Sequence, residues 1–391
     1  MRPAPDLVPY PRFSAAEFEA RHDHVARLIA AHELEALVVF GNAGSRAEIQ
    51  YLTGWPPRHD SFLIIGSGIQ PALLVQLYNH VPTAEAMASV GRVRWGGSDS
   101  IAAVADELRA RGAGGRVGTV GLIPFQQHAR LVSAVEPATL VDVTQAFRRI
   151  RLVKSEEEIA WTRRGAELCD IAMEALVEAA RPGAFEYELG AAVENAYSRR
   201  GGGHGICFIA TAPMSGGGRI VPSQQWSERQ IAAGDSIMIE LSAGVGGYTS
   251  QILRTIAVAG EPPQRMRELH EVADAAFAAI VTAIHPGATA SDLLEAASVI
   301  DKSGYSVCDD VVHGYGGGYL PPILRTPATM TGPIPDFTLE PGMMVVVQPN
   351  VIDTSVSLGV QTGELILVTT GGNERLHRLP RGLLRAEPQV P

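Results

Sequence analysis

The C-terminal part of the sequence contains a diverged internal repeat, and this repeat limits the possible folds most strongly. The segment around Pro182-Gly-Ala is echoed around Pro286-Gly-Ala at an offset of 104 residues. In both copies a helix should stop at Pro-Gly and a new helix should start within a few residues. Residues 234–240 (GDSIMIE) and 342–348 (GMMVVVQ) repeat at an offset of 108 residues. We therefore predict two pseudo-symmetric halves, each built from helices and a buried strand.

Each repeated strand is apolar and ends on a large polar side chain, Glu240 in the first copy and Gln348 in the second. A carboxylate that closes an apolar strand is costly to bury unless another group pairs with it or uses it. The glycine-rich residues 244–247 then predict a tight turn, and residues 248–255 predict the return strand. Two pseudo-symmetric halves would bring Glu240 and Gln348 to one shared cleft. Glu240 is therefore a site candidate, with an exposed carboxylate beside a turn as the alternative.

The length of 391 residues favours two domains, because one hydrophobic core rarely serves a chain of this size. Residues 1–150 alternate expected helices and strands, which predicts an α/β domain. The elements expected there are a helix opened by a capping box at 14–17, strands at 36–40, 62–65, 72–75 and 117–122, and a helix at 99–111. A long amphipathic helix over residues 154–180 opens the second domain, residues 151–391. The predicted fold class is α/β (α+β), in two domains.

Composition and charge exclude several classes of partner. The formal net charge of −10 argues against nucleic acid and against an anionic membrane. Cys169, Cys207 and Cys308 lie far apart without a CxxC motif, which predicts neither a disulfide framework nor a thiolate zinc site. Residues 1–12 are Pro-rich and polar, without the apolar core of a signal peptide, and no later apolar run approaches membrane-spanning length. We expect a soluble, cytoplasmic protein that binds a small molecule.

The pattern as a whole resembles the creatinase/aminopeptidase P family, whose C-terminal domain has the pita-bread fold. The matching motifs span nearly the whole chain: Tyr51-Leu-Thr-Gly54, Lys154-Ser-Glu-Glu-Glu-Ile159, Gly234-Asp235, Arg254-Thr255, His313 in a Gly-rich strand, Leu339-Glu-Pro-Gly-Met343 and Leu367-Val-Thr369. The resemblance implies a creatinase-type N-terminal domain over residues 1–150 and a pita-bread catalytic domain over residues 151–391. It also implies a homodimer.

Peptidases of this family hold two divalent metal ions with two Asp, one His and two Glu side chains. The resemblance places these five positions on Glu240, Gln251, His313, Gln348 and Gly363, with Glu364 beside the last. A dinuclear site needs bridging carboxylates to neutralise two dications, and an amide or a glycine cannot supply them. The upstream histidine of the peptidases and creatinase falls on Ser223. We therefore predict no metal and no other cofactor, and we rank Xaa-Pro metallopeptidase activity last.

The family also has members without metal: creatinase hydrolyses a guanidino C–N bond, and ectoine hydrolase opens a cyclic amidine. Ectoine hydrolases are similar to this chain in the Ile239-Glu240 strand end and in losing the second aspartate before Arg254-Thr255. The motifs Gln348-Pro-Asn and GVQTGE (residues 359–364) match neither enzyme. Large polar side chains at the former carboxylate positions nevertheless indicate a retained function, because a decaying site should also accumulate small and apolar residues.

In such a site, Glu240 is expected to act as base or nucleophile, since partial burial raises the pKa of a carboxyl group. His313 is expected to shuttle a proton near neutral pH, with a structural histidine in a Gly-rich turn as the alternative. Glu364, the third catalytic candidate, would neutralise a cationic group or act as a structural acid. The candidate substrate-binding residues are Gln251, Gln348, Gln361, Arg254, Tyr315 and Ser223. A structural ion pair is the alternative for Arg254, and core packing is the alternative for Tyr315.

These residues predict a metal-independent hydrolase of a C–N bond in a small nitrogenous compound, similar to creatine or ectoine. One alternative is a lyase, in which the same side chains abstract a proton for β-elimination. Another alternative, from a different class, is a non-catalytic pita-bread protein that binds a ligand or peptide. Glu240→Gln separates these classes, because a binding protein would keep its affinity after the change.

Overall fold

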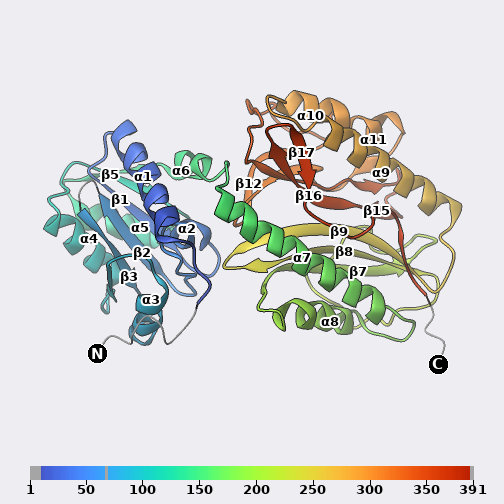
Figure 1. Cartoon of the computed structure of the whole chain (residues 1–391), viewed down its shortest axis with the longest axis horizontal. Coiled ribbons are helices and arrows are strands. Elements are labelled where there is room, and N and C mark those ends of the chain that lie inside the picture. Colours follow the sequence, from blue (N-terminus) through green and yellow to red (C-terminus); the bar gives the residue numbers. More distant parts are fainter. Residues whose placement is uncertain (1–9, 67–68, 388–391) are drawn as a thin grey trace. The chain divides into compact units, whose positions relative to one another are not determined.

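The computed structural model describes residues 10–66 and 69–387, in two compact units, Met1–Arg151 and Leu152–Pro391 (Figure 1). Residues 1–9 of the Pro-rich segment discussed above lie outside the described residues. In the part of the chain that the structure describes, no helix combines the length and the apolar character needed to cross a bilayer.

A mixed six-stranded sheet, in the order β4-β3-β2-β1-β5-β6, forms the centre of the N-terminal unit. Strand β1 alternates between two apolar clusters, with Leu37 and Val39 in one and Val38 and Phe40 in the other. Successive strand residues point to opposite faces, so both faces of this sheet are covered. The elements are α1 (Ala15–Ala31), β1 (Ala36–Gly41), α2 (Ala47–Thr53), β2 (Ser61–Gly66), β3 (Ile69–Val75), η1 (Tyr78–His80), α3 (Val81–Met87), β4 (Arg92–Trp95), α4 (Ser100–Ala110), β5 (Arg116–Val120), α5 (Phe125–Val135), β6 (Thr139–Asp142) and α6 (Thr144–Ile150).

The C-terminal unit is built on a nine-stranded sheet with the main order β12-β11-β13-β16-β9-β8-β7, to which β17 and β18 add at β16 and β9. A small second sheet has the order β10-β14-β15. The elements are α7 (Glu156–Ala179), α8 (Glu186–Ser198), β7 (Gly203–Pro213), β8 (Asp235–Val245), β9 (Tyr248–Val258), α9 (Gln264–Ala283), α10 (Ala290–Ala297), α11 (Val299–Lys302), β10 (Ser306–Val307), β11 (Val312–Tyr315), β12 (Tyr319–Leu324), β13 (Met344–Val347), β14 (Asn350–Ile352), β15 (Gly359–Gln361), β16 (Gly363–Thr369), β17 (Gly372–Arg375) and β18 (Leu384–Ala386).

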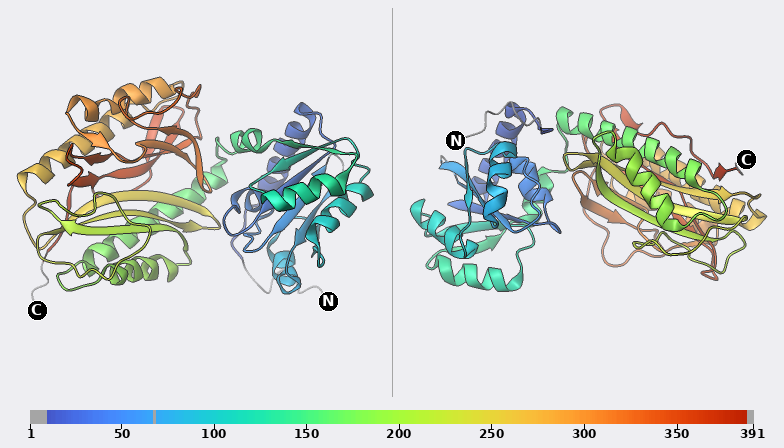
Figure 2. Two further views of the ribbon diagram at one scale, coloured as in Figure 1. Left: turned by 180° about the vertical axis from the view of Figure 1, so that it is seen from behind. Right: turned by 90° about the horizontal axis from the view of Figure 1, so that it is seen from below.

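Helix α7 begins at a complete capping box, in which Ser155 and Glu158 each bond the other's backbone N–H. Three glutamates in its first turn also complement the positive end of the helix dipole. The apolar side chains of α7 and α8 pack with those of β7, β8 and β9 in one cluster. Figure 2 shows these green helices covering the yellow-green strands.

The predicted internal repeat is confirmed. Helix α7 ends at Ala179 and α8 begins at Glu186, while α9 ends at Ala283 and α10 begins at Ala290, the same 104-residue spacing as the two Pro-Gly-Ala motifs. Both Pro-Gly turns make an equivalent backbone hydrogen bond. Gly183 donates its N–H to Ile231 O, and Gly287 donates its N–H to Leu339 O, each at 2.8 Å. The two halves therefore share helix boundaries and turn contacts.

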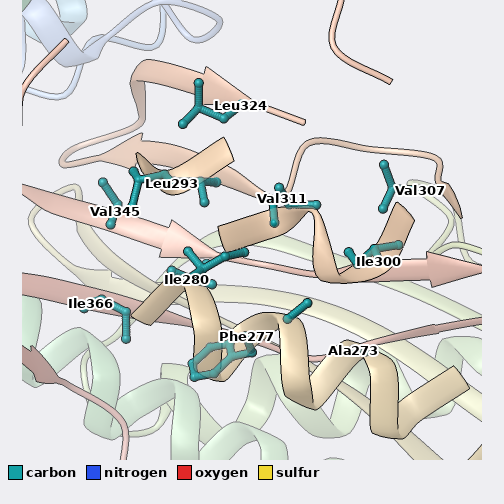
Figure 3. Close-up of a cluster of buried hydrophobic side chains, with 14 of the residues drawn as sticks. Ala273, Phe277, Ile280, Leu293, Ile300, Val307, Val311, Leu324, Val345 and Ile366 are labelled. Carbon is teal, nitrogen blue, oxygen red and sulfur yellow. The ribbon is translucent and has the colours of Figure 1, made fainter. Parts of the chain in front are cut away.

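The second half has its own apolar core between its helices and the sheet. Phe277 and Ile280 of α9 pack with Leu293 of α10 and with Val345 and Ile366 of the strands (Figure 3). All five side chains are at most 1% exposed. This packing holds β13 and β16 in place, and these strands carry part of the site described below.

One strand boundary differs from the prediction. Glu240 does not close its strand, because β8 continues to Val245 and pairs with β9 along its whole length. The β8–β9 turn is made by Gly246 and Gly247, with φ of 58° and 84°. Positive φ at both central residues is typical of the two-residue hairpin turn, and glycine adopts it without strain. Glu240 therefore projects from the middle of a long hairpin.

Candidate functional site

The β8–β9 hairpin and β16 place, on one face of the large sheet, three of the five positions that the family resemblance assigns to metal ligands. Glu240 lies opposite Leu253, and Leu253 lies opposite Gly363 of β16. Directly opposed residues share a face, and so do residues two apart on a strand. Gln251 precedes Leu253 by two residues, so its side chain is on the face that carries Glu240.

Strands β11 and β13 bring the other two positions to the same face. His313 lies opposite Val346, and Val346 lies opposite Leu365, which follows Gly363 by two residues. Gln348 follows Val346 by two residues, just after β13 ends. The duplication thus gathers residues that are more than 100 positions apart in the sequence.

The side chain of Glu240 reaches solvent, although the strand segment that carries it is buried. It is partly exposed, whereas the other residues from Asp235 to Gly244 are buried. Its Oε1 accepts a hydrogen bond of 2.7 Å from Gln251 Nε2. Burial, and after it the negative charge of Asp309, raises the pKa of Glu240 to about 7. A carboxyl group of this kind carries and releases a proton near neutral pH.

Two amide side chains connect Glu240 to a second acid, Asp310. Gln251 Nε2 also donates to Gln348 Oε1 at 3.1 Å. Gln348 Nε2 in turn donates to Asp310, with 3.3 Å to Oδ1 and 3.4 Å to the backbone O. We call Glu240, Gln251, Gln348 and Asp310 the acid–amide cluster.

Asp310 was missed by the sequence analysis, and it is the most unusual carboxyl group of the cluster. It is 3% exposed, and its Oδ1 accepts 2.7 Å from the hydroxyl of Tyr319. Its Oδ2 is buried without a hydrogen-bond partner. Burial raises the pKa of Asp310 to about 8, against a lowering by the Tyr319 bond and with a further rise from Asp309. The available signal was two consecutive aspartates directly before a buried Val-Val run.

His313 lies beside the cluster, but it does not fit the predicted role of a proton shuttle near neutral pH. Its ring is fully buried and stacks on Tyr319 with ring centroids 3.9 Å apart. Its Nδ1 is 3.1 Å from Gly314 O, and its Nε2 is buried without a partner. Burial disfavours the imidazolium and lowers the pKa of His313 to about 4. The histidine is therefore neutral at pH 7, and that prediction is corrected.

Three other candidate residues use their polar groups within the fold. Gln361 Nε2 donates to Ile239 O at 2.8 Å, directly before Glu240 in the chain. The Tyr315 hydroxyl is bonded to Ser242 and Thr249, at 3.1 and 2.6 Å. Ser223 bridges to Ile209 of β7, and its hydroxyl donates to Gln225 O within its own turn. These side chains support the strands around Glu240, and their direct contact with a substrate stays a prediction.

Arg254 and Glu364 are on the opposite face of the sheet from Glu240. Arg254 lies opposite Ile239, and Glu364 lies opposite Ile252. Because strand residues alternate between faces, both side chains are on the face opposite the acid–amide cluster. The two side chains are fully buried and paired with each other, and Arg375 forms a bidentate pair with the same carboxylate. The predictions of a catalytic Glu364 and a substrate-binding Arg254 are corrected, because these charges neutralise one another inside the fold.

The side chains at the five family positions do not fit a pair of divalent ions. They offer one carboxylate, two amides and one imidazole, and the fifth position has no side chain. A Cβ atom at Gly363 would lie 2.8 Å from Val347 O and 2.9 Å from Gln348 Cα, so the backbone closes this position. Across residues 10–66 and 69–387, no three His, Cys, Asp or Glu side chains are grouped so that they could hold one metal ion. Two adjacent dications need bridging carboxylates to neutralise their charge, and these five positions offer a single carboxylate.

The family is settled by comparison with known proteins. The chain matches Metallopeptidase family M24 over residues 160–370 and the Creatinase/Prolidase N-terminal domain over residues 21–153. It is 30% identical to the Xaa-Pro dipeptidase of Pyrococcus furiosus over 242 residues, which cover 62% of this chain and 68% of that protein. The prolidase structure from Pyrococcus horikoshii aligns with a TM-score of 0.80 at 23% identity, covering 93% of this chain and 100% of that one. The chain belongs to metallopeptidase family M24, the creatinase/aminopeptidase P family with the pita-bread fold.

These relatives overturn the predicted function. An Xaa-Pro aminopeptidase of Escherichia coli and Xaa-Pro dipeptidases of Pyrococcus are among them, so the prediction of a metal-independent hydrolase of creatine- or ectoine-like compounds is wrong. The alternatives of a lyase and of a non-catalytic binding protein gain no support from these names. The hydrolase class is supported by the family. The cytoplasmic location and the homodimer stay predictions.

Proposed function

We propose that this protein hydrolyses the peptide C–N bond of a short peptide, with Glu240 as the general base. The observation that carries this proposal is the partly exposed Glu240 within an otherwise buried strand segment, with a pKa raised to about 7. A base is most effective when its pKa lies near the working pH. The names of the relatives direct the first choice of substrate to Xaa-Pro dipeptides.

In this reaction a water molecule attacks the carbonyl carbon of the peptide bond. Glu240 takes a proton from that water as the new C–O bond forms. Gln251 holds Oε1 of Glu240 at 2.7 Å, which fixes the orientation of the carboxylate. A hydrogen bond to a charged acceptor also favours the ionised form that a base requires. Since the residues do not fit a pair of metal ions, we assign no step to a metal.

The test is hydrolysis of a panel of Xaa-Pro and Xaa-Ala dipeptides by wild type and by Glu240→Gln, with and without added Mn²⁺. The variant keeps the shape of the side chain and its contact with Gln251, so it should fold normally. We expect the wild type to hydrolyse at least one dipeptide class. Loss of the base should lower kcat by about 10²–10⁴-fold.

The matched control is Glu261→Gln, an exposed carboxylate paired with Arg385 in the same unit. This variant should keep wild-type kcat. The proposal is wrong if no peptide is hydrolysed under either condition, or if Glu240→Gln is as active as the wild type.

A further inference from the structure

The leaving nitrogen must gain a proton, which is either the one that Glu240 took from water or one from a second acid. We propose that Asp310 is this second acid of the site, and that the side chains of Gln251 and Gln348 hold it in a fixed relation to Glu240. This inference rests on the proposed function for the step it assigns to Asp310. The pairing of the two acids can be tested without any turnover.

The bridge between the two acids has a defined direction. Gln251 Nε2 uses its two hydrogens on Glu240 Oε1 and Gln348 Oε1. With its oxygen thus occupied, Gln348 turns its Nε2 towards Asp310. Both carboxyl groups therefore accept hydrogen bonds from the bridge, at its opposite ends. Gln251 and Gln348 are positioning residues in this arrangement.

Asp310 has an oxygen that the fold does not use. Its Oδ1 accepts from Tyr319 and Gln348, whereas Oδ2 is buried and has no hydrogen-bond partner. Leaving a buried polar atom without a hydrogen bond destabilises the folded protein. A carboxyl group with a purely structural role would use both oxygens, as Glu364 does with its two arginines. The unused oxygen is the natural position for the proton that Asp310 donates.

Burial, with a further contribution from Asp309, raises the pKa of Asp310 to about 8 against the lowering by the Tyr319 bond. Asp310 meets Asp309 from its own loop, Tyr319 from β12 and the amide of Gln348 from the end of β13. Burial, and after it the charges of Asp310, Asp309 and Glu240, raises the pKa of Tyr319, so this hydroxyl stays protonated and donates to Asp310. His313, stacked on Tyr319, is neutral. No cationic side chain contributes to the pKa shift of Asp310 or of Glu240.

The proton balance of the cycle is then complete. Water loses a proton to the Glu240 carboxylate and its oxygen bonds to the carbonyl carbon. The C–N bond breaks as the Asp310 carboxylic acid transfers its proton to the leaving nitrogen. Glu240 afterwards releases its proton to solvent, and Asp310 takes one back from solvent. One water is consumed per peptide bond, and no oxidant or reductant is needed.

The experiment compares wild type, Asp310→Asn and Tyr319→Phe in the pH dependence of dipeptide kcat. We expect wild type to lose activity above about pH 8, where Asp310 ionises. Asp310→Asn should lower kcat by about 10²-fold or more, with KM nearly unchanged. It should also abolish the loss of activity above about pH 8, the alkaline limb of the pH profile. Tyr319→Phe removes a bond that favours the ionised form, so its alkaline limb should move to higher pH. Tyr319 is 52% exposed, which makes this change tolerable for the fold.

Infrared titration of the protonated carboxyl band supplies a readout that needs no substrate. Two carboxyl groups should titrate near and above neutrality in the wild type, and Asp310→Asn and Glu240→Gln should each remove one. An unchanged band or an unchanged alkaline limb in Asp310→Asn overturns the inference. If the wild type hydrolyses no peptide, the proposed function is wrong. The infrared titration then still tests the pairing: two titrating carboxyl groups support the paired acids, and a single one contradicts them.

Discussion

Glu240 and Asp310 are carboxyl groups with a raised pKa, and burial is the largest cause in both cases. They differ in what holds them. Gln251 bonds Glu240, which is partly exposed, whereas Tyr319 and Gln348 bond Asp310, which is buried. This difference in environment supports our proposal that the partly exposed Glu240 is the base and the buried Asp310 is the acid.

Asp309→Asn tests the electrostatic coupling of the two acids. The charge of Asp309, an exposed residue, raises the pKa of both Glu240 and Asp310. Its removal should lower both pKa values, so the base ionises at lower pH and the acid loses its proton at lower pH. The whole pH–kcat profile should move to lower pH, with kcat at the optimum within about threefold of wild type because an exposed charge contributes under about 1 kcal/mol. A shift to higher pH would contradict this coupling.

At the scale of elements, the strands determine which residues meet. Sequence periodicity and the repeat predicted β8, β9, β13 and the helix pairs, because apolar runs and Pro-Gly turns are local signals. The end of β8 was misplaced, since pairing of residues 241–245 with β9 is a tertiary effect. Asp310 was missed for a similar reason: its partners Tyr319 and Gln348 lie 9 and 38 positions away. The burial that makes His313 neutral likewise depends on neighbouring strands.

Gly363→Ala tests whether the backbone leaves no room for a side chain at position 363, the fifth of the metal positions taken from the family resemblance. The new Cβ would meet the backbone of Val347 and Gln348 at 2.8–2.9 Å, so we expect a loss of about 1–3 kcal/mol in the free energy of unfolding, measured in urea. Gly371→Ala is the control, in the turn between β16 and β17, where a Cβ meets nothing within 4 Å. It should stay within about 0.5 kcal/mol of wild type. Equal stability of both variants would mean that position 363 has room for a side chain.

At the scale of the whole molecule, the chain has the architecture of metallopeptidase family M24, but it lacks most carboxylates at the positions that the sequence resemblance assigns to metal ligands. The pseudo-symmetric halves still bring all five positions to one face of the sheet. An acid–amide network now lies there, with one carboxylate among the former ligand positions and a second, Asp310, outside them. The fold was predictable from sequence motifs, whereas the function assigned from the substituted side chains was not.

The most direct test of this site is elemental analysis for transition metals in protein purified without chelators. One carboxylate, two amides, a neutral imidazole and a glycine do not hold two dications. We therefore expect well below one bound metal ion per chain. Two tightly bound ions per chain would contradict the acid–amide cluster and would place a dinuclear centre at these positions.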